Sequence, residues 1–313
     1  MASSYERINY SLRPAKNIQR KMLAAAFQRL SGFGRLKSYR YIGFGSTFFS
    51  DFSLFHKTLG IVDMLSIERD VDRADRFESN KPFHCIEMDF RESNQALPSL
   101  DWNQKTILWL DYDDKLTSSV LTDVQFFCSN APAASVIVVT VDAEPDAMES
   151  DRLELMRGRV GPAKLPQGTD AARLEGWELA NISRSILTTE IRDTIRQRNG
   201  VLAGGFKLEY HQLFNFHYAD GAKMTTVGGI ICEEGQRPIL DSCDFTNMDF
   251  VKTEAEPFHI EVPSLTFKEL RLLDRILPFG DLVNGAPPGV PEDDVDRYAK
   301  VYRYFPTFVD AEF

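Results

Sequence analysis

The chain has 313 residues, which is enough for one large domain or two ordinary ones with a substantial buried core. Its apolar and charged fractions, 43% and 26%, are those of a globular protein. The formal net charge of −10 argues against an extended phosphate-binding surface, because nucleic-acid binders usually present a basic face. Four widely spaced cysteines without a Cys-x-x-Cys pair indicate neither a zinc knuckle nor a disulfide framework, and we expect reduced thiols.

The sequence contains no obvious targeting or membrane segment. The first ten residues lack the apolar core of a signal peptide, and no run of about 18 apolar residues occurs. We therefore expect a cytoplasmic protein with no membrane-spanning segment. The pattern carries no indication of a particular oligomeric state.

Residues 1–38 form a predicted N-terminal helical extension. Apolar residues recur at helical spacing over residues 15–30, which predicts an amphipathic helix packed on the core. Just before and inside its first turn lie the cations Arg13 and Lys16, on either side of Pro14, a residue suited to a first helical turn. These cations either face a ligand or are solvated at the helix start.

The stretch 39–68 has the pattern of a strand, a helix and a second strand. A buried strand over residues 39–44 leads into a turn with Gly43 and Gly45, a helix covers about 48–59, and a strand over 62–67 ends at Glu68. A turn of small residues lets a ligand approach the backbone, and an acid after the next strand can accept both hydroxyls of a ribose. Glu68 lies 25 positions after Gly43, beyond the roughly 20 expected. The alternative is a packing turn followed by a solvated acid.

Three more strands follow, and acids stand where they end. We expect a short helix over 72–80, strands over 84–89, 105–111 and 135–141, and a helix over 119–128. Because parallel strands share one carboxyl edge, this predicts a doubly wound sheet with an acidic functional edge. The acids expected there are Glu68, Asp89, Asp111 and possibly Asp142.

The second half is predicted to add a hairpin and helices. Residues 149–168, rich in Arg, Lys, Gly and Pro, are expected to form an irregular segment or lid, and 169–198 a helix. Alternation up to Tyr218, an Asp220-Gly221 turn and a strand over 223–232 predict an antiparallel hairpin. The tail, 234–313, is expected to be loop, helix, loop, helix, with a capping box at Thr266. We expect residues 39–233 to be one domain with the two ends as helical appendages.

Five β/α units followed by a hairpin resemble the class I S-adenosylmethionine-dependent methyltransferases. The resemblance covers about residues 39–232 and is strongest to uncharacterised bacterial proteins labelled "putative O-methyltransferases". It implies a doubly wound, mostly parallel seven-stranded α/β sheet with a C-terminal antiparallel hairpin, and S-adenosylmethionine as cofactor. The cofactor-binding residues that it implies are Gly43, Phe44, Gly45, Ser46, Glu68, Arg69, Asp89, Phe90 and Asp111.

The glycine motif departs from the pattern of that family. The usual acid two positions before the first glycine is Tyr41 here, and the third glycine is Thr47. The resemblance therefore implies that other groups hold the methionine end of the cofactor. Asp111 and the cations of the N-terminal extension, Lys16 and Arg13, are the candidates.

Methyl transfer requires an acceptor held in line and sometimes a base. Asp113 and Asp114 are the acids best placed to act as catalytic groups, with His211 and His217 of the hairpin as alternatives. The cluster of Asp111, Asp113 and Asp114 could instead hold a divalent metal, but no second set of ligands is evident, and we expect none.

The sequence leaves the acceptor open within limits. The Asn-Pro-Pro-Tyr or Asp-Pro-Pro-Tyr motif of amino-methylating DNA enzymes is absent, and so is a Pro-Cys nucleophile. Small-molecule or protein acceptors are therefore favoured over nucleic acid. Two alternatives to an O-methyltransferase remain: a nucleotide-dependent oxidoreductase, and a non-catalytic nucleotide sensor or scaffold with the same fold.

Overall fold

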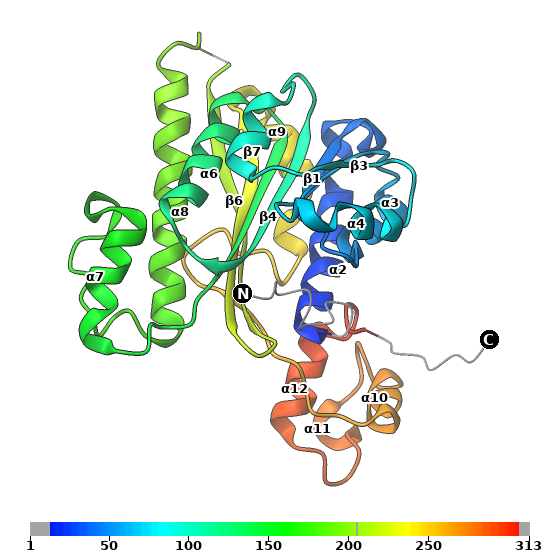
Figure 1. Ribbon diagram of the computed structural model, residues 1–313. Coiled ribbons are helices and arrows are strands. Elements are labelled where there is room, and N and C mark those ends of the chain that lie inside the picture. The colour runs from blue at the N-terminus through cyan, green and yellow to red at the C-terminus, as the bar shows by residue number, and fades with distance from the viewer. Residues whose placement is uncertain (1–12, 205, 307–313) are drawn as a thin grey trace.

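The computed structural model describes residues 13–204 and 206–306, and the strands of this part form one eight-stranded sheet (Figure 1). Residues 1–12 of the predicted N-terminal extension therefore lie outside the described residues. The strand order is β3-β2-β1-β4-β5-β7-β6-β8. The strands are β1 (Arg40–Gly43), β2 (Asp63–Ile67), β3 (Ile86–Asp89), β4 (Thr106–Lys115), β5 (Ser135–Asp142), β6 (Leu208–Ala219), β7 (Lys223–Glu233) and β8 (Phe258–Ile260).

The predicted mixed sheet is confirmed, but its strand count is eight and not seven. The strands β1 to β5 pair in parallel, whereas β7 is antiparallel to both β5 and β6. The additional strand, β8, pairs in parallel with β6 through Phe216 and Phe258. The sequence pattern missed it because three residues are too few to show a period of two, so only long-range pairing defines this strand.

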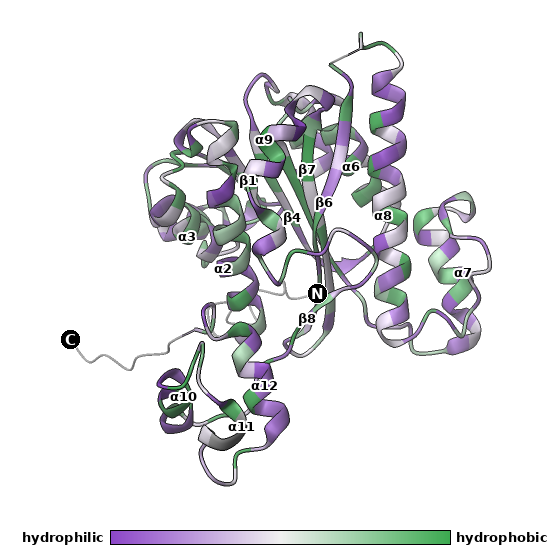
Figure 2. Ribbon diagram, turned by 180° about the vertical axis from the view of Figure 1, so that it is seen from behind, coloured by the Kyte–Doolittle hydropathy of each residue, from purple (hydrophilic) through white to green (hydrophobic). Residues whose placement is uncertain are grey.

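Helices cover both faces of the sheet. On one face lie α2 (Pro14–Arg29) and α3 (Ser50–Leu59), and on the other α6 (Ser118–Asn130) and the long α8 (Gly176–Asn199). Figure 2 shows hydrophobic and hydrophilic residues alternating along α8, as expected for a helix with one buried face. The remaining helices are α4 (Ala74–Asn80), α5 (Ser93–Ala96), α7 (Glu149–Val160), α9 (Arg237–Ser242), α10 (Phe267–Asp274), α11 (Leu282–Gly285) and α12 (Glu292–Val301).

The expectation of an irregular segment over residues 149–168 is wrong for its first part, which is helix α7. Glu149 in the first turn and Arg157 in the last complement the helix dipole, and Gly158 is tolerated inside the helix. The helix ends where Gly161 takes a positive φ of 87° before Pro162. The prediction gave too much weight to isolated Gly and Pro residues and too little to these charges.

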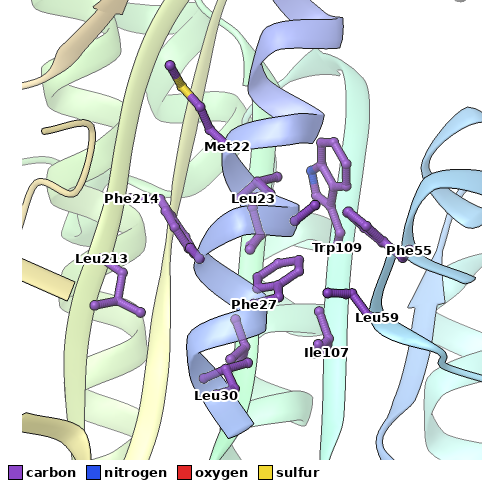
Figure 3. Close-up of a cluster of buried hydrophobic side chains, with 14 of the residues drawn as sticks. Met22, Leu23, Phe27, Leu30, Phe55, Leu59, Ile107, Trp109, Leu213 and Phe214 are labelled. Carbon is purple, nitrogen blue, oxygen red and sulfur yellow. The ribbon is translucent and has the colours of Figure 1, made fainter. Parts of the chain in front are cut away.

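The N-terminal helix α2 is built into the body of the protein. Phe27 lies between Phe55 of α3 and Phe214 of β6, with ring centroids 5.4 and 6.0 Å away (Figure 3). Its first turn is capped from a distance: the backbone N–H groups of Ala15 and Lys16 donate to the Asp220 carboxylate, over 3.1 and 2.8 Å. The hairpin turn therefore fixes where α2 begins, and an acid at this end suits the helix dipole.

Helices α10, α11 and α12 lie beyond the end of the sheet at which α2 begins (Figure 1). The capping box of Thr266 and Glu269 is confirmed, and it opens α10 as predicted. A small cluster around Leu273, Val295 and Tyr298 holds α10 and α12 together. The expected loop-helix-loop-helix order omitted β8 and the short helices α9 and α11. In the described part of the chain, no helix is long and apolar enough to cross a membrane.

Candidate active site

A cavity of about 190 Å³ opens at the carboxyl ends of β1, β2 and β4; we call it the edge cavity. One water needs roughly 10–15 Å³, so this space suits a small molecule. It lies beside β1, where the strand order reverses: β2 and β3 follow on one side of β1, and β4 and β5 on the other. Such a reversal is the usual ligand site of doubly wound sheets. Its lining residues are Arg20, Phe44, Gly45, Ser46, Ser50, Asp51, Ile67, Glu68, Arg69, Asp70, Arg91, Glu92, Ser93, Asp111, Tyr112, Asp113 and Asp114.

The turn after β1 requires its two glycines. A Cβ on Gly43 would lie 2.5 Å from the Tyr41 hydroxyl, and one on Gly45 would lie 2.6 Å from the Phe49 ring. The Gly45 N–H donates to Ser66 Oγ on β2 over 3.0 Å, which ties the turn to the neighbouring strand. The bare backbone at Gly45 is therefore held open to the edge cavity.

Glu68 follows β2 and joins the turn to the cavity wall. Its Oε1 accepts from the Ser46 N–H over 2.7 Å, and its own N–H donates to Asp89 O over 2.9 Å. Burial raises the pKa of Glu68 to about 7, although the Ser46 N–H partly offsets this effect. The carboxyl group therefore changes protonation state near neutral pH.

The acid missing at position 41 is replaced in space by Asp51. The Tyr41 hydroxyl donates to Asp51 Oδ2, and Asp51 lines the edge cavity from the first turn of α3. Burial raises the pKa of Asp51, whereas the positive charge of Arg20 lowers it. The sequence analysis missed Asp51 because an acid in the first turn of a helix is common. The one indication in the sequence was Tyr41, which stands where the family usually has an acid.

Asp111 lines the cavity floor and is held by the N-terminal helix. Lys16 Nζ donates to Asp111 Oδ1 and, over 2.9 Å, to the Tyr218 hydroxyl. One turn further along α2, Arg20 reaches the cavity wall itself and is only 6% exposed. Of the cations Arg13, Lys16 and Arg20, only Arg20 therefore lines the cavity, and the sequence analysis did not single it out.

The end of β4 presents two exposed acids at the cavity. The pairing of β4 with β5 is irregular between Asp111 and Lys115, so Asp113 and Asp114 lie in a bulged segment. Just before them, Tyr112 also lines the cavity and is fixed in place, because its hydroxyl and that of Ser93 both donate to Asp123 over 2.5 Å. These hydrogen bonds anchor the end of β4 beside the two exposed acids.

The predicted site residues fall into two groups. Phe44, Gly45, Ser46, Glu68, Arg69, Asp111, Asp113 and Asp114 line the edge cavity, whereas Gly43, Asp89, Phe90 and Lys16 are not among its lining residues. Asp89 accepts from Arg91 Nε over 2.7 Å, and Arg91 is on the wall. The lining residues not foreseen are Arg20, Ser50, Asp51, Ile67, Asp70, Arg91, Glu92, Ser93 and Tyr112.

Neither His211 nor His217, the alternative catalytic groups, lines the edge cavity. His217 is buried, and its ring stacks on Trp177 with centroids 4.9 Å apart; burial lowers its pKa to about 3. His211 lies beside Glu209, 3.3 Å between Nε2 and Oε2. Within residues 13–204 and 206–306, no group of three or more His, Cys, Asp or Glu side chains is arranged to hold a metal ion.

A parallel sheet in the order 3-2-1-4-5, completed by an antiparallel seventh strand next to the fifth, is the arrangement of class I methyltransferases. The edge cavity, with a glycine turn on one side and an acid after β2 on the other, lies at the carboxyl edge of this sheet. The chain belongs to the family described as "Putative O-methyltransferase", which matches residues 8–313.

Solved structures with similar folds are distant in sequence. Trm1 from Pyrococcus horikoshii, in complex with S-adenosyl-L-methionine, is 8% identical with a TM-score of 0.48, covering 82% of this chain and 67% of its own. The N-methyltransferase NodS from Bradyrhizobium japonicum, in complex with S-adenosyl-L-homocysteine, is 8% identical with a TM-score of 0.41, covering 71% and 89%. A "putative O-methyltransferase" from Klebsiella pneumoniae is 11% identical with a TM-score of 0.36, covering 69% and 88%. No curated protein sequence matches the chain.

Proposed function

We propose that the protein is an S-adenosylmethionine-dependent methyltransferase that methylates an oxygen atom of a small molecule or a protein. The observation that carries the proposal is the Glu68 carboxyl group, held 2.7 Å from the Ser46 N–H at the mouth of the glycine turn. A carboxylate there can accept both hydroxyls of a ribose. Membership of the O-methyltransferase family supports oxygen as the acceptor atom.

The charges of the edge cavity suggest how the cofactor lies. With the ribose at Glu68, the amino-acid end would reach the floor, where the carboxylates of Asp51 and Asp111 suit an ammonium group and Arg20 suits a carboxylate. The adenine would then extend towards Ser93 and Arg91 on the opposite wall. The residues that would hold the cofactor in this orientation stand beside the open end of β4.

Catalysis would consist mainly of holding the two reacting atoms in line and close together. The bound cofactor supplies the electrophilic methyl group. Asp113 and Asp114, exposed on the bulged end of β4, are the groups that we assign to orient the acceptor and to take its proton.

The acidic wall bears on the choice of acceptor. Seven of the lining residues are Asp or Glu and three are Arg, and the whole chain carries a net charge of −10. Like charges at a contact disfavour binding, so a polyanion such as nucleic acid is a poor partner for this surface. A neutral or cationic small molecule, or a protein segment of that character, is favoured.

The first test is ligand-dependent melting followed by methyl transfer. We expect S-adenosylmethionine and S-adenosylhomocysteine, but not NADH, to raise the melting temperature, by the equivalent of about 2.7 kcal/mol at a hundredfold excess over Kd. Methyl-labelled cofactor and a cell extract should then give a labelled acceptor. Stabilisation by NADH alone would support an oxidoreductase instead, and binding without transfer to any extract would support a nucleotide sensor.

The second test concerns the two acids of β4. We expect the double variant Asp113→Asn/Asp114→Asn to keep the cofactor Kd while methyl transfer falls about 10²- to 10⁴-fold, the usual contribution of a general base. Asp241→Asn, an exposed acid on α9, is the matched control and should change neither quantity. Full transfer by the double variant would remove both residues from the mechanism.

A further inference from the structure

Lys16 is a buried cation that does not reach the edge cavity. Its side chain is 5% exposed, and its Nζ lies 4.8 Å from the Trp109 ring centroid and 5.5 Å from that of Tyr218. Burial lowers the pKa of Lys16 to about 8, against the opposing effect of Asp111. A group in this position cannot touch a ligand in the cavity, so any effect on the ligand must pass through a neighbour.

That neighbour is Asp111, which does line the cavity. Lys16 binds its Oδ1, which leaves Oδ2 as the oxygen without this ion pair. An ion pair on one oxygen of a carboxylate fixes the rotation of the group. Removing the Lys16 cation would leave the Asp111 carboxylate, which is 22% exposed, beside the other acids of the cavity without this partner.

The position of Lys16 is itself set by the hairpin. Asp220 accepts from the Lys16 backbone N–H over 2.8 Å, and the hydroxyl of Tyr218, two residues earlier, accepts from the side chain over 2.9 Å. Both contacts come from the end of β6 and its turn. The hairpin, α2 and β4 are thereby joined at one point, directly behind the floor of the cavity.

We propose that Lys16 is a positioning residue that fixes the rotation of the Asp111 carboxylate, so that its other oxygen, Oδ2, receives the α-ammonium of the cofactor. This inference rests on the proposed function. It assigns the end of α2 to recognition of the amino-acid part of the ligand, as opposed to its nucleoside. The other titratable or charged groups around Asp111 are Arg20 on α2, Tyr41 on β1, Asp51 on α3, Tyr218 on β6 and Asp220 in the hairpin turn.

The experiment compares two ligands that differ at the amino-acid end. S-adenosylhomocysteine carries the ammonium group, whereas 5′-methylthioadenosine has the same nucleoside and sulfur but no amino-acid end. We expect Lys16→Met to weaken S-adenosylhomocysteine about 10-fold or more, the range for a hydrogen bond to a charged group, and methylthioadenosine by less than about 2-fold. Calorimetric titration at pH 7.5 gives both values.

Three controls separate positioning from general damage. Lys21→Met makes the same change on the same helix, where Lys21 donates to Phe305 O over 3.1 Å, and should leave both affinities unchanged. Asp111→Asn should lose the same affinity for S-adenosylhomocysteine, and Lys16→Met should add nothing in that background, because the two residues act together. The double variant Lys16→Met/Asp111→Asn leaves no carboxylate without its cation at this point. It can therefore be compared with Asp111→Asn if Lys16→Met alone does not fold.

The outcomes are distinct. Equal weakening of both ligands, or unchanged affinity for S-adenosylhomocysteine, would overturn the role of Lys16 while the methyltransferase proposal stands. Failure of the unaltered protein to bind either ligand would instead refute the proposed function.

Discussion

Glu68→Gln is expected to weaken S-adenosylmethionine binding about 10- to 100-fold, the effect of losing a charge-assisted hydrogen bond. The amide keeps an oxygen that can accept from the Ser46 N–H, so the turn should stay in place. It cannot accept from both ribose hydroxyls at once, and this is the lost interaction. Isothermal titration calorimetry at pH 8 measures the effect.

The same substitution should stabilise the empty protein at pH 8. The pKa of Glu68 is about 7 in the folded chain against an ordinary value of 4.5, so the folded state binds an extra proton between these pH values. Stability of the unaltered protein therefore falls as pH rises from 4.5 to 7, and the full penalty persists above pH 7. Since one pKa unit corresponds to about 1.4 kcal/mol, we expect Glu68→Gln to gain on the order of 3 kcal/mol at pH 8 and little at pH 4.5.

Glu68→Gln is thus expected to weaken cofactor binding and to raise the stability of the empty protein at pH 8, so general damage to the fold cannot account for both results. Glu87→Gln, on the exposed side of β3, is the matched control and should change neither binding nor the pH dependence of unfolding. Urea unfolding at pH 5 and pH 8 provides the stability values. An unchanged Kd for S-adenosylmethionine would refute the ribose contact. If the Glu68→Gln protein is no more stable than the unaltered protein at pH 8, the energetic cost of the buried Glu68 charge is refuted.

Gly45→Ala is expected to damage both the turn and the site. The added methyl group would lie 2.6 Å from Phe49 Cδ1 and 2.8 Å from Ser66 Oγ, both in the buried interior. Phe49 already stands in the left-handed region with φ 46°, where it begins α3, and has little freedom to move. Overpacking of this kind costs about 1–3 kcal/mol, and we expect the unfolding midpoint in urea to fall accordingly.

The displaced turn should also bind the cofactor poorly, because Gly45 is part of the cavity wall. Gly158→Ala adds the same methyl group inside α7, where nothing lies within 4 Å of it. That control should be more stable by about 0.5–1 kcal/mol, since alanine favours a helix, and should bind normally. A Gly45→Ala protein with native stability and affinity would contradict the steric role of the turn.

Much of the fold follows from residues close together in the sequence. The apolar strands β1, β4 and β5, the glycine turn, the Asp220-Gly221 hairpin and the capping box at Thr266 all depend on local spacing. The acid after β2 could also be placed, because parallel strands must share an edge once their order is known. These features were predictable for the same reason: propensity, period and capping act over a few residues.

The remaining features depend on contacts between distant segments. Lys16 and Asp111 are 95 positions apart, and Asp220 caps a helix that begins more than 200 positions earlier. Asp51 replaces the acid missing at Tyr41 only because α3 folds back over β1. No local pattern marks such pairs.

The sequence by itself thus determined the parallel strands, the glycine turn and the acid that follows β2, because apolar runs and turn chemistry are properties of neighbouring residues. Only the tertiary structure decided which charges meet on the cavity floor, since packing of α2 between β6 and α3 brings them there. Burial then changes their chemistry, as the raised pKa of Glu68 and the lowered pKa of Lys16 show.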